Sequence, residues 1–118
     1  MRLGIVGSRT FNDYSLLEKA LNKLANRIDI KTIVSGGARG ADSLAIKYAE
    51  VNNIETIVFK PDWSIGKAAA AIRNRKIVDN IDILIAFWDG TSKGTRMTID
   101  MAKSKNIKVL KIIYTEIL

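Results

Sequence analysis

The stretch Thr32-Ile33-Val34-Ser35-Gly36-Gly37-Ala38-Arg39-Gly40-Ala41-Asp42 decides how this chain folds. A short apolar run passes into a turn of small residues, and the turn opens a segment with helical periodicity. Two further stretches repeat the pattern, since residues 3–6 run into Gly7-Ser8-Arg9 and residues 83–88 run into a turn over residues 89–95. Each such turn presents unpaired backbone N–H groups at the positive end of a helix dipole. The pattern therefore predicts a cradle for phosphate or carboxylate groups.

Outward from these turns, strand-like and helix-like segments alternate along the chain. Short apolar runs predict strands, and longer segments with apolar residues three or four positions apart predict helices. The expected strands are residues 2–6, 32–34, 55–59, 83–87 and 108–112, and the expected helices are residues 13–28, 41–51, 66–80 and 94–105. Within the first helix, Ser15-Leu16-Leu17-Glu18 resembles a capping box.

This order of segments predicts a single domain over residues 1–118 with an α/β fold. The expected architecture is a doubly wound, Rossmann-like sheet of five parallel strands in the order 3-2-1-4-5. Ligands of such sheets bind at the carboxyl ends of the strands, here between strands one and four. The three glycine-rich turns are expected to meet at that place.

Composition restricts the chemistry that is available. The 118 residues are 47% hydrophobic and 26% charged, as in ordinary globular domains, and no apolar run approaches the ~20 residues of a membrane span. The absence of Cys and His excludes disulfides, zinc sites built on these residues, thiol nucleophiles and imidazole acid–base chemistry. We expect a cytoplasmic protein without metal or cofactor. The net charge of +7 favours an anionic partner, either a nucleotide or a nucleic acid.

The small residues of the first two turns have two alternative roles. Their backbone N–H groups and hydroxyl groups either hold phosphate oxygens, or the glycines simply permit tight turns and close contact between helix and sheet. The candidate ligand-binding residues of these turns are Gly7, Ser8, Ser35, Gly36, Gly37, Ala38 and Gly40.

The third turn combines hydroxyl side chains with glycines at the start of a helix. Such a helix start is rich in hydrogen-bond donors, and it faces the same edge of the predicted sheet. Its candidate ligand-binding residues are Asp89, Gly90, Ser92, Gly94 and Thr95.

Two charged residues close to the turns are further candidates. Arg9 either grips a phosphate with its two parallel donors or forms an ion pair with Asp42 or Asp13. Asp42 lies in the first turn of its helix, where it either caps the helix and complements its dipole or accepts hydrogen bonds from a ribose hydroxyl.

Three candidates lie beyond the third predicted strand. Arg73 and Asn74 either contact the ligand or form surface pairs. Trp63 lies in the segment Lys60-Pro61-Asp62-Trp63-Ser64-Ile65-Gly66, which follows the third strand and is expected to form a flap over the site. In that position the indole can stack on a base.

Taken together, these motifs resemble the SLOG superfamily, with the branch related to YspA and YpsA nearest. The motifs occur in family order over nearly the whole chain: Gly7-Ser8-Arg9, the turn at residues 35–42, Pro61-Asp62-Trp63, Gly66-Lys67-Ala68-Ala69, Ile72-Arg73-Asn74 and the turn at residues 88–95. The resemblance implies a Rossmann-like fold that binds nucleotides or nucleotide-derived ligands. Relatives include the LOG phosphoribohydrolases, the DNA-processing protein DprA, molybdenum cofactor carriers and sensors of antiviral defence.

One departure from the LOG pattern bears on catalysis. The motif Pro-Gly-Gly-x-Gly-Thr-x-x-Glu of the LOG hydrolases carries a catalytic Glu, and its counterpart here is Gly94-Thr95-Arg96-Met97-Thr98. Thr98 stands in the place of the Glu, and a hydroxyl group cannot replace a carboxylate as an acid–base group. The departure favours a protein without a LOG-type catalytic residue.

Three functions follow as hypotheses. The first is a binding module for a nucleotide or a nucleotide-derived, phosphate-bearing small molecule, acting as sensor, carrier or signal-sequestering protein. The second is a nucleotide-cleaving enzyme in which Asp42, Asp89 or Glu50 supplies the carboxylate. The third is single-stranded DNA binding similar to that of DprA. The resemblance also implies a homodimer or higher homo-oligomer, with Ile117-Leu118 as a plausible contact.

Overall fold

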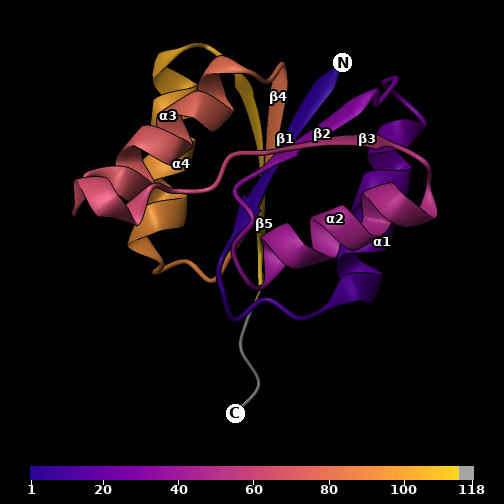
Figure 1. Cartoon of the computed structure of the whole chain (residues 1–118). Helices are drawn as coiled ribbons and strands as arrows, with labels where there is room; N and C mark the ends of the chain where they lie inside the picture. Colours follow the sequence, from indigo (N-terminus) through magenta and orange to yellow (C-terminus); the bar gives the residue numbers. More distant parts are fainter. Residues whose placement is uncertain (115–118) are drawn as a thin grey trace.

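The computed structural model describes residues 1–114, in which five strands alternate with four α-helices and one short 3-10 helix (Figure 1). In chain order they are β1 (Arg2–Gly7), α1 (Tyr14–Ala25), β2 (Thr32–Ser35), α2 (Ala41–Val51), β3 (Glu55–Val58), η1 (Trp63–Ile65), α3 (Ala69–Asp79), β4 (Ile83–Trp88), α4 (Lys93–Ser104) and β5 (Lys108–Ile113). Every predicted strand and helix is present, and the bounds of α2 coincide with the prediction.

All strands are parallel and lie in the order β3-β2-β1-β4-β5, which confirms the predicted fold. The two central strands, β1 and β4, are almost wholly apolar because both faces of a doubly wound sheet are covered. Their pairing sets Gly7 beside Phe87, so the turns that follow β1 and β4 leave the sheet next to each other.

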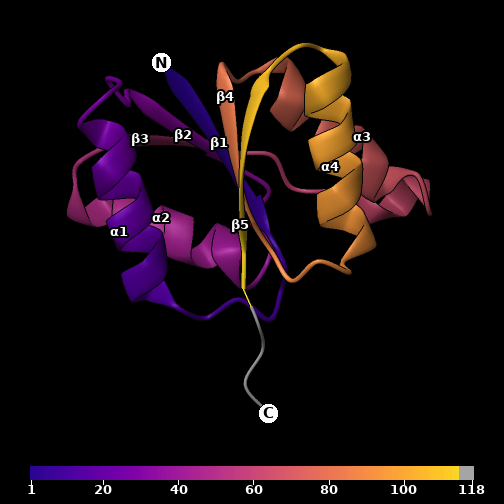
Figure 2. The same ribbon diagram turned by 180° about the vertical axis from the view of Figure 1, so that it is seen from behind.

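Two helices cover each face of the sheet, as Figures 1 and 2 show from opposite sides. Leu17 and Leu21 of α1 pack with α2 against the Ile5 face of the sheet. Ile77 of α3 and Ile99 of α4 pack against the other face. Since side chains alternate along a strand, each central strand contributes to both cores.

The first helix begins and ends differently from the prediction of residues 13–28. Asp13 is its N-cap, and the Asp13 carboxylate accepts a hydrogen bond from the backbone N–H of Leu16 at 3.0 Å. The predicted capping box at Ser15 is therefore wrong, because the cap lies two residues earlier. The helix ends at Ala25.

The segment predicted as one helix over residues 66–80 contains a break at its start. Gly66 has a φ of 88°, in the left-handed region, and it ends η1 instead of continuing into a helix. The Asp62 carboxylate caps η1 by accepting the backbone N–H of Ser64 at 3.1 Å. The helix α3 consequently starts only at Ala69.

Candidate functional site

A cleft of about 360 Å³ opens at the carboxyl ends of β1 and β4, at the predicted switch point. Its walls come from the turns after β1, β2 and β4, from the start of α2, and from the sides of α3 and α4. The candidate residues that line it are Gly7, Ser8, Arg9, Ala38, Asp42, Arg73, Asn74, Asp89, Ser92, Gly94 and Thr95. Residues that the sequence placed in separate motifs therefore meet in one cleft.

Some candidate residues do not line this cleft. They are Ser35, Gly36, Gly37, Gly40, Trp63 and Gly90. Gly37 and Gly90 face solvent, and Trp63 is 60% exposed on η1. The segment predicted as a flap thus packs beside α3.

The glycines that bring the turns together have packing roles. Gly40 has a φ of 78°, and a Cβ there would lie 2.4 Å from the backbone oxygen of Ser8. A Cβ on Gly7 would lie 2.5 Å from Cβ of Ala41 and 2.6 Å from the backbone oxygen of Phe87. The start of α2 can approach β1 this closely only because neither position carries a side chain.

Asp42, at the start of α2, stabilises the turn between β2 and α2. Its Oδ2 accepts the backbone N–H groups of Gly36 and Ala38, each at 3.2 Å, and the residue is only 5% exposed. These are two of the N–H groups that the sequence assigned to a ligand phosphate, and in the structure they serve the Asp42 carboxylate. Burial raises the pKa of Asp42 to about 6, against the opposing effects of the Ala38 N–H, Arg73 and the Gly36 N–H.

Ser35 lies under the same turn and is buried. Its hydroxyl lowers the pKa of Asp42, although Oγ makes no hydrogen bond among residues 1–114. The Ser35 side chain therefore acts on the Asp42 carboxylate and favours its ionised form.

Two guanidinium groups lie at the cleft, that of Arg9 from the turn after β1 and that of Arg73 from α3. Arg73 donates from Nη1 to the backbone oxygen of Gly36 at 2.8 Å and from Nε to Oδ1 of Asn74 at 2.8 Å. Burial lowers the pKa of Arg73, Asp42 opposes this effect and Arg9 adds to it. Arg9 is exposed and forms no ion pair within the described chain, so the predicted pairs with Asp42 and Asp13 are absent there. An anion between the two arginines would relieve their repulsion.

Ser8, Asp89 and Ser92 join the turns after β1 and β4. Ser8 is buried and accepts the backbone N–H of Asp89 at 3.2 Å, while the Ser92 hydroxyl lies 3.0 Å from Ser8 Oγ and 2.9 Å from Asp89 Oδ2. A hydroxyl has only one proton. When Ser92 donates to Asp89, the Ser8 proton is left for the Ser92 oxygen or for a molecule in the cleft.

Asp89 is held in its ionised form by its own turn. Its Oδ1 accepts the backbone N–H groups of Thr91 at 2.9 Å and Ser92 at 2.7 Å. Desolvation raises the pKa of Asp89, but these N–H groups and the Ser92 hydroxyl outweigh it and lower the pKa to about 2. A carboxyl with so low a pKa is a weak general base near neutral pH.

The N-terminal turn of α4 presents free donors to the cleft. Lys93, Gly94 and Thr95 are its first three residues, and their backbone N–H groups have no partner among residues 1–114. Thr95 is only 6% exposed, and its hydroxyl also lacks a partner within that range. Lys93 also lines the cleft, although it is not among the residues predicted to bind the ligand. Its place between Ser92 and Gly94 at a helix start is the signal that favours an anion contact.

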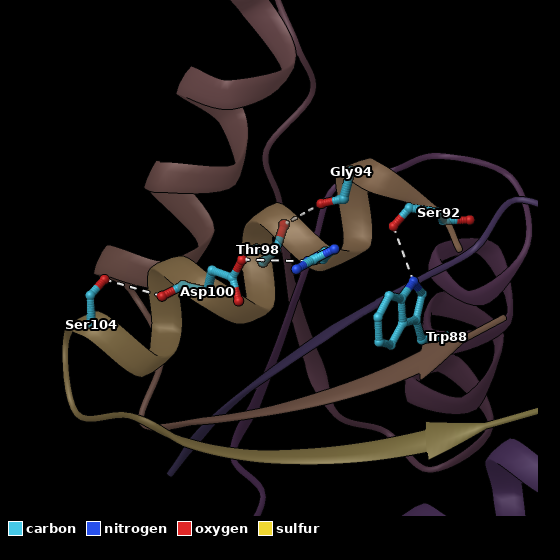
Figure 3. A network of polar contacts seen from close by, with 7 residues as sticks. Trp88, Ser92, Gly94, Thr98, Asp100 and Ser104 are labelled. Atoms are coloured by element: carbon cyan, nitrogen blue, oxygen red, sulfur yellow. Dashed lines mark hydrogen bonds and ion pairs between the residues drawn. The ribbon is translucent and has the colours of Figure 1, made fainter. Parts of the chain in front are cut away.

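Figure 3 shows how this turn is fixed. The indole N–H of Trp88 donates to the backbone oxygen of Ser92 at 3.0 Å. Thr98 also lines the cleft, and its hydroxyl donates to the backbone oxygen of Gly94 at 3.2 Å. Thr98, which stands where the LOG motif has its catalytic Glu, therefore uses its hydroxyl proton within α4.

A doubly wound α/β domain with a donor-rich cleft at its switch point belongs to the class of Rossmann-like ligand-binding folds. This chain belongs to the YspA, cpYpsA-related SLOG family, whose profile matches residues 1–66. The superfamily expected from the sequence motifs is thereby confirmed.

A relative and two solved structures extend the comparison. Gene 61 protein of Mycobacterium phage D29 is 34% identical over 117 residues, which cover 92% of this chain and 94% of that protein. DNA processing protein A from Streptococcus pneumoniae has a TM-score of 0.78 and 22% identity, over 97% of this chain and 50% of that one. The Helicobacter pylori protein, described for its single-stranded DNA binding mode, has a TM-score of 0.73 and 20% identity, over 94% and 64%. This chain thus spans half to about two thirds of the DprA chains and shares their fold.

Within residues 1–114, no helix combines the length and the apolar character that crossing a bilayer requires. The same part of the chain contains no group of three or more Asp or Glu residues arranged to hold a metal ion.

Proposed function

We propose that this protein binds a nucleotide or a nucleotide-derived, phosphate-bearing small molecule in the cleft between the turns after β1 and β4. One observation carries the proposal: Arg9, Arg73 and Lys93 converge there with three free backbone N–H groups of α4 and the unpartnered hydroxyl of Thr95. Positive side chains and a helix N-terminus together favour a phosphate group. The cleft volume of about 360 Å³ lies within the range of small-ligand sites.

We further propose that the ligand is held without being cleaved. Thr98 offers a hydroxyl that already donates within α4, and Asp89 has a pKa of about 2. Neither group is suited to take a proton from water at neutral pH. The third carboxylate of the cleft, Asp42, already accepts the backbone N–H groups of Gly36 and Ala38. A protein of this kind acts as a sensor, a carrier or a sequestering module for its ligand.

The first test is calorimetric titration with the common nucleoside monophosphates and with inorganic phosphate. Thr95→Val should weaken binding by about 1 kcal/mol, the usual contribution of one hydrogen bond. Thr56→Val, on the exposed edge strand β3, is the matched control and should leave affinity unchanged. Equal affinity of Thr95→Val and the original protein would place the phosphate elsewhere.

The second test concerns turnover. Each monophosphate that binds is incubated overnight with stoichiometric protein, and free base is quantified by chromatography. We expect no release beyond that of a protein-free control. Multiple turnovers that disappear in Asp42→Asn would replace the binding proposal by an enzymatic one.

Single-stranded DNA binding is the second candidate function. The net charge of +7 favours it, as does the shared fold with a protein described for binding single-stranded DNA. DNA binding of this kind weakens steeply with salt because phosphate contacts release counterions. Oligonucleotide titrations between about 50 and 200 mM salt should show a loss of several hundredfold or more if this function holds. A mononucleotide bound in the cleft should depend far less on salt.

A further inference from the structure

The helix α4 carries a row of charged and apolar side chains on the face that it turns away from the sheet. Figure 2 shows α4 at the outside of the molecule. This face forms a shallow groove of about 460 Å³, which we call the α4 stripe, and its residues are Lys93, Arg96, Met97, Asp100, Met101 and Ser104. They recur at intervals of three or four positions, so they lie in one row along the helix. The residues of α4 that are buried are Thr95, Thr98, Ile99 and Ala102.

The charges of the α4 stripe have a direction along the helix. Lys93 and Arg96 lie in its first half, whereas Asp100 lies in its second half. Within one chain, Arg96 Nε lies 4.0 Å from Asp100 Oδ2, and the two side chains are 72% and 66% exposed. So exposed an ion pair contributes little to the stability of its own helix. Both charged groups are therefore available to a partner at small cost.

Two methionines form an apolar flank of the α4 stripe. Met97 is 40% exposed, and Met101 is half-buried. Asn74 of α3 donates from Nδ2 to Met97 Sδ at 3.8 Å, so the methionine flank is the one next to α3. That helix exposes Ile72, which adds to the apolar surface. Neighbouring apolar side chains that face water favour a contact with another protein surface.

This pattern is complementary to a second copy of α4 that runs in the opposite direction. A two-fold axis perpendicular to the helix brings Arg96 of each copy beside Asp100 of the other, so two ion pairs form together. The same axis keeps like flanks on the same side, so the methionines of both copies meet. In a parallel arrangement Arg96 would face Arg96 and Asp100 would face Asp100, and both pairs would repel.

We infer that the α4 stripe is the contact surface between two copies of this chain, which pack antiparallel and pair through Arg96 and Asp100. A partner of uniform charge fits less well, because an acidic surface repels Asp100 and a basic surface repels Arg96. A stable interface buries about 800 Å² on each partner, so the outer face of α3 with Ile72 is expected to take part. This inference is independent of the proposed function.

The test exchanges charges between two variants. Arg96→Glu leaves only acidic groups at the two pairing positions, and Asp100→Arg leaves only basic ones. Light scattering at micromolar concentration should give each variant the monomer mass of 13.1 kDa and the original protein twice that mass. Arg96→Glu makes the chain less positive as a whole, so general repulsion does not explain its dissociation.

Mixing the two variants is the decisive step. In equal amounts they should form a dimer with each other, because opposite charges then face each other at both positions. An ion pair that forms only within one helix cannot produce this association. The matched control uses the exposed pair Asp29 and Lys31, and the variants Lys31→Glu and Asp29→Arg should both remain dimeric.

A second measurement replaces the charge exchange if a variant does not fold. The chain contains no cysteine, so Met97→Cys introduces a single thiol close to the inferred axis. Dissolved oxygen should link two copies of this variant by a disulfide, whereas Asp29→Cys should stay unlinked. A lack of linkage in Met97→Cys overturns the inference.

The other outcomes also decide the matter. An original protein of monomer mass overturns the inference and leaves the α4 stripe to a different partner. A dimer that persists in both charge variants moves the contact elsewhere, and variants that stay monomeric on mixing refute the pairing. Neither Arg96 nor Asp100 lines the cleft, so ligand titrations of the same variants test the proposed function separately.

Discussion

Arg9 and Arg73 reach the cleft from different elements, and each carries a charge without a carboxylate within 4.0 Å in the described chain. Arg73 is already oriented, because Gly36 and Asn74 accept two of its donors and leave the others for a ligand. At the scale of single residues, we therefore propose that these two side chains contact the phosphate of the ligand.

The first prediction concerns the two arginines. Arg9→Ala and Arg73→Ala should each weaken binding of a nucleoside monophosphate by about 1.5–3 kcal/mol, since each removes a charge-assisted hydrogen bond. Arg75→Ala, an exposed residue of α3, is the control and should change affinity little. Isothermal titration measures all three, and an unchanged affinity in both cleft variants would contradict the assignment of the phosphate.

The second prediction links Asp42 to stability. Its pKa is about 6 in the folded protein and near 3.8 in the unfolded chain. Between these pH values the folded state binds more protons, so the free energy of unfolding falls as pH rises through this window. The loss amounts to about 3 kcal/mol from this group. Below about pH 4 the effect of Asp89 is opposite, because its pKa is lowered to about 2 and its contribution is lost in acid.

Thermal unfolding between pH 4.5 and 6.5 tests this prediction. The melting temperature of the original protein should fall by several degrees as the pH rises from 4.5 to 6.5, and the melting temperature of Asp42→Asn should change far less. Asp29→Asn is the control and should follow the original protein. A parallel decline in Asp42→Asn would mean that another group titrates.

At the scale of elements, the turns do more than connect strands to helices. Asp13, Asp62 and Asp89 each accept backbone N–H groups of the residues that follow them, so three of the connections at the carboxyl edge carry their own acceptor. These local bonds set where α1 and η1 begin and hold the turn that precedes α4.

The third prediction tests the cap of α1. Asp13→Ala should lower the free energy of unfolding by about 1 kcal/mol, because the N–H of Leu16 loses its acceptor. Ser15→Ala should leave the free energy of unfolding unchanged or raise it slightly, since Ser15 is not the cap and Ala has the higher helix propensity. Urea denaturation of both variants separates them. The reverse order would restore the capping box expected from the sequence.

The succession of elements could be predicted because each has a clear period and length. Apolar runs of four to six residues between amphipathic segments predict a parallel sheet, and the order of the sheet follows from right-handed crossovers. The start of α3 could not be predicted in this way. Four alanines favour a helix over the whole segment, whereas the left-handed Gly66 and the Asp62 cap end a short turn first.

The location of the cleft could also be predicted, since three glycine-rich turns follow neighbouring strands. Which backbone N–H groups of these turns stay free for a ligand could not be predicted. Gly36 and Ala38 carry the backbone N–H groups that a cradle motif indicates, yet the carboxylate of Asp42 reaches back and occupies them. A contact between a turn and the helix that follows depends on side-chain rotamers, which residue type and spacing do not specify.

At the scale of the whole molecule, we expect a homodimer. Large apolar side chains are exposed on η1, α3 and α4, among them Ile65, Ile72 and Met97. The predicted contact at Ile117-Leu118 lies outside the described residues. Light scattering at micromolar concentration should give twice the mass of 13.1 kDa. Ile65→Glu with Ile72→Glu should shift the mass toward the monomer, and Val51→Glu on α2 should not.

The two ends of the sheet differ in what they are used for. The cleft opens at the carboxyl edge, whereas the turns at Asn53 and Asn106 lie at the amino edge and contribute no residue to its lining. A fluorescent label or a peptide tag attached at either asparagine should therefore leave the cleft unobstructed. Because the two edges are separate, substitutions at the carboxyl edge can change ligand recognition, and insertions at the amino edge can be accepted without affecting it.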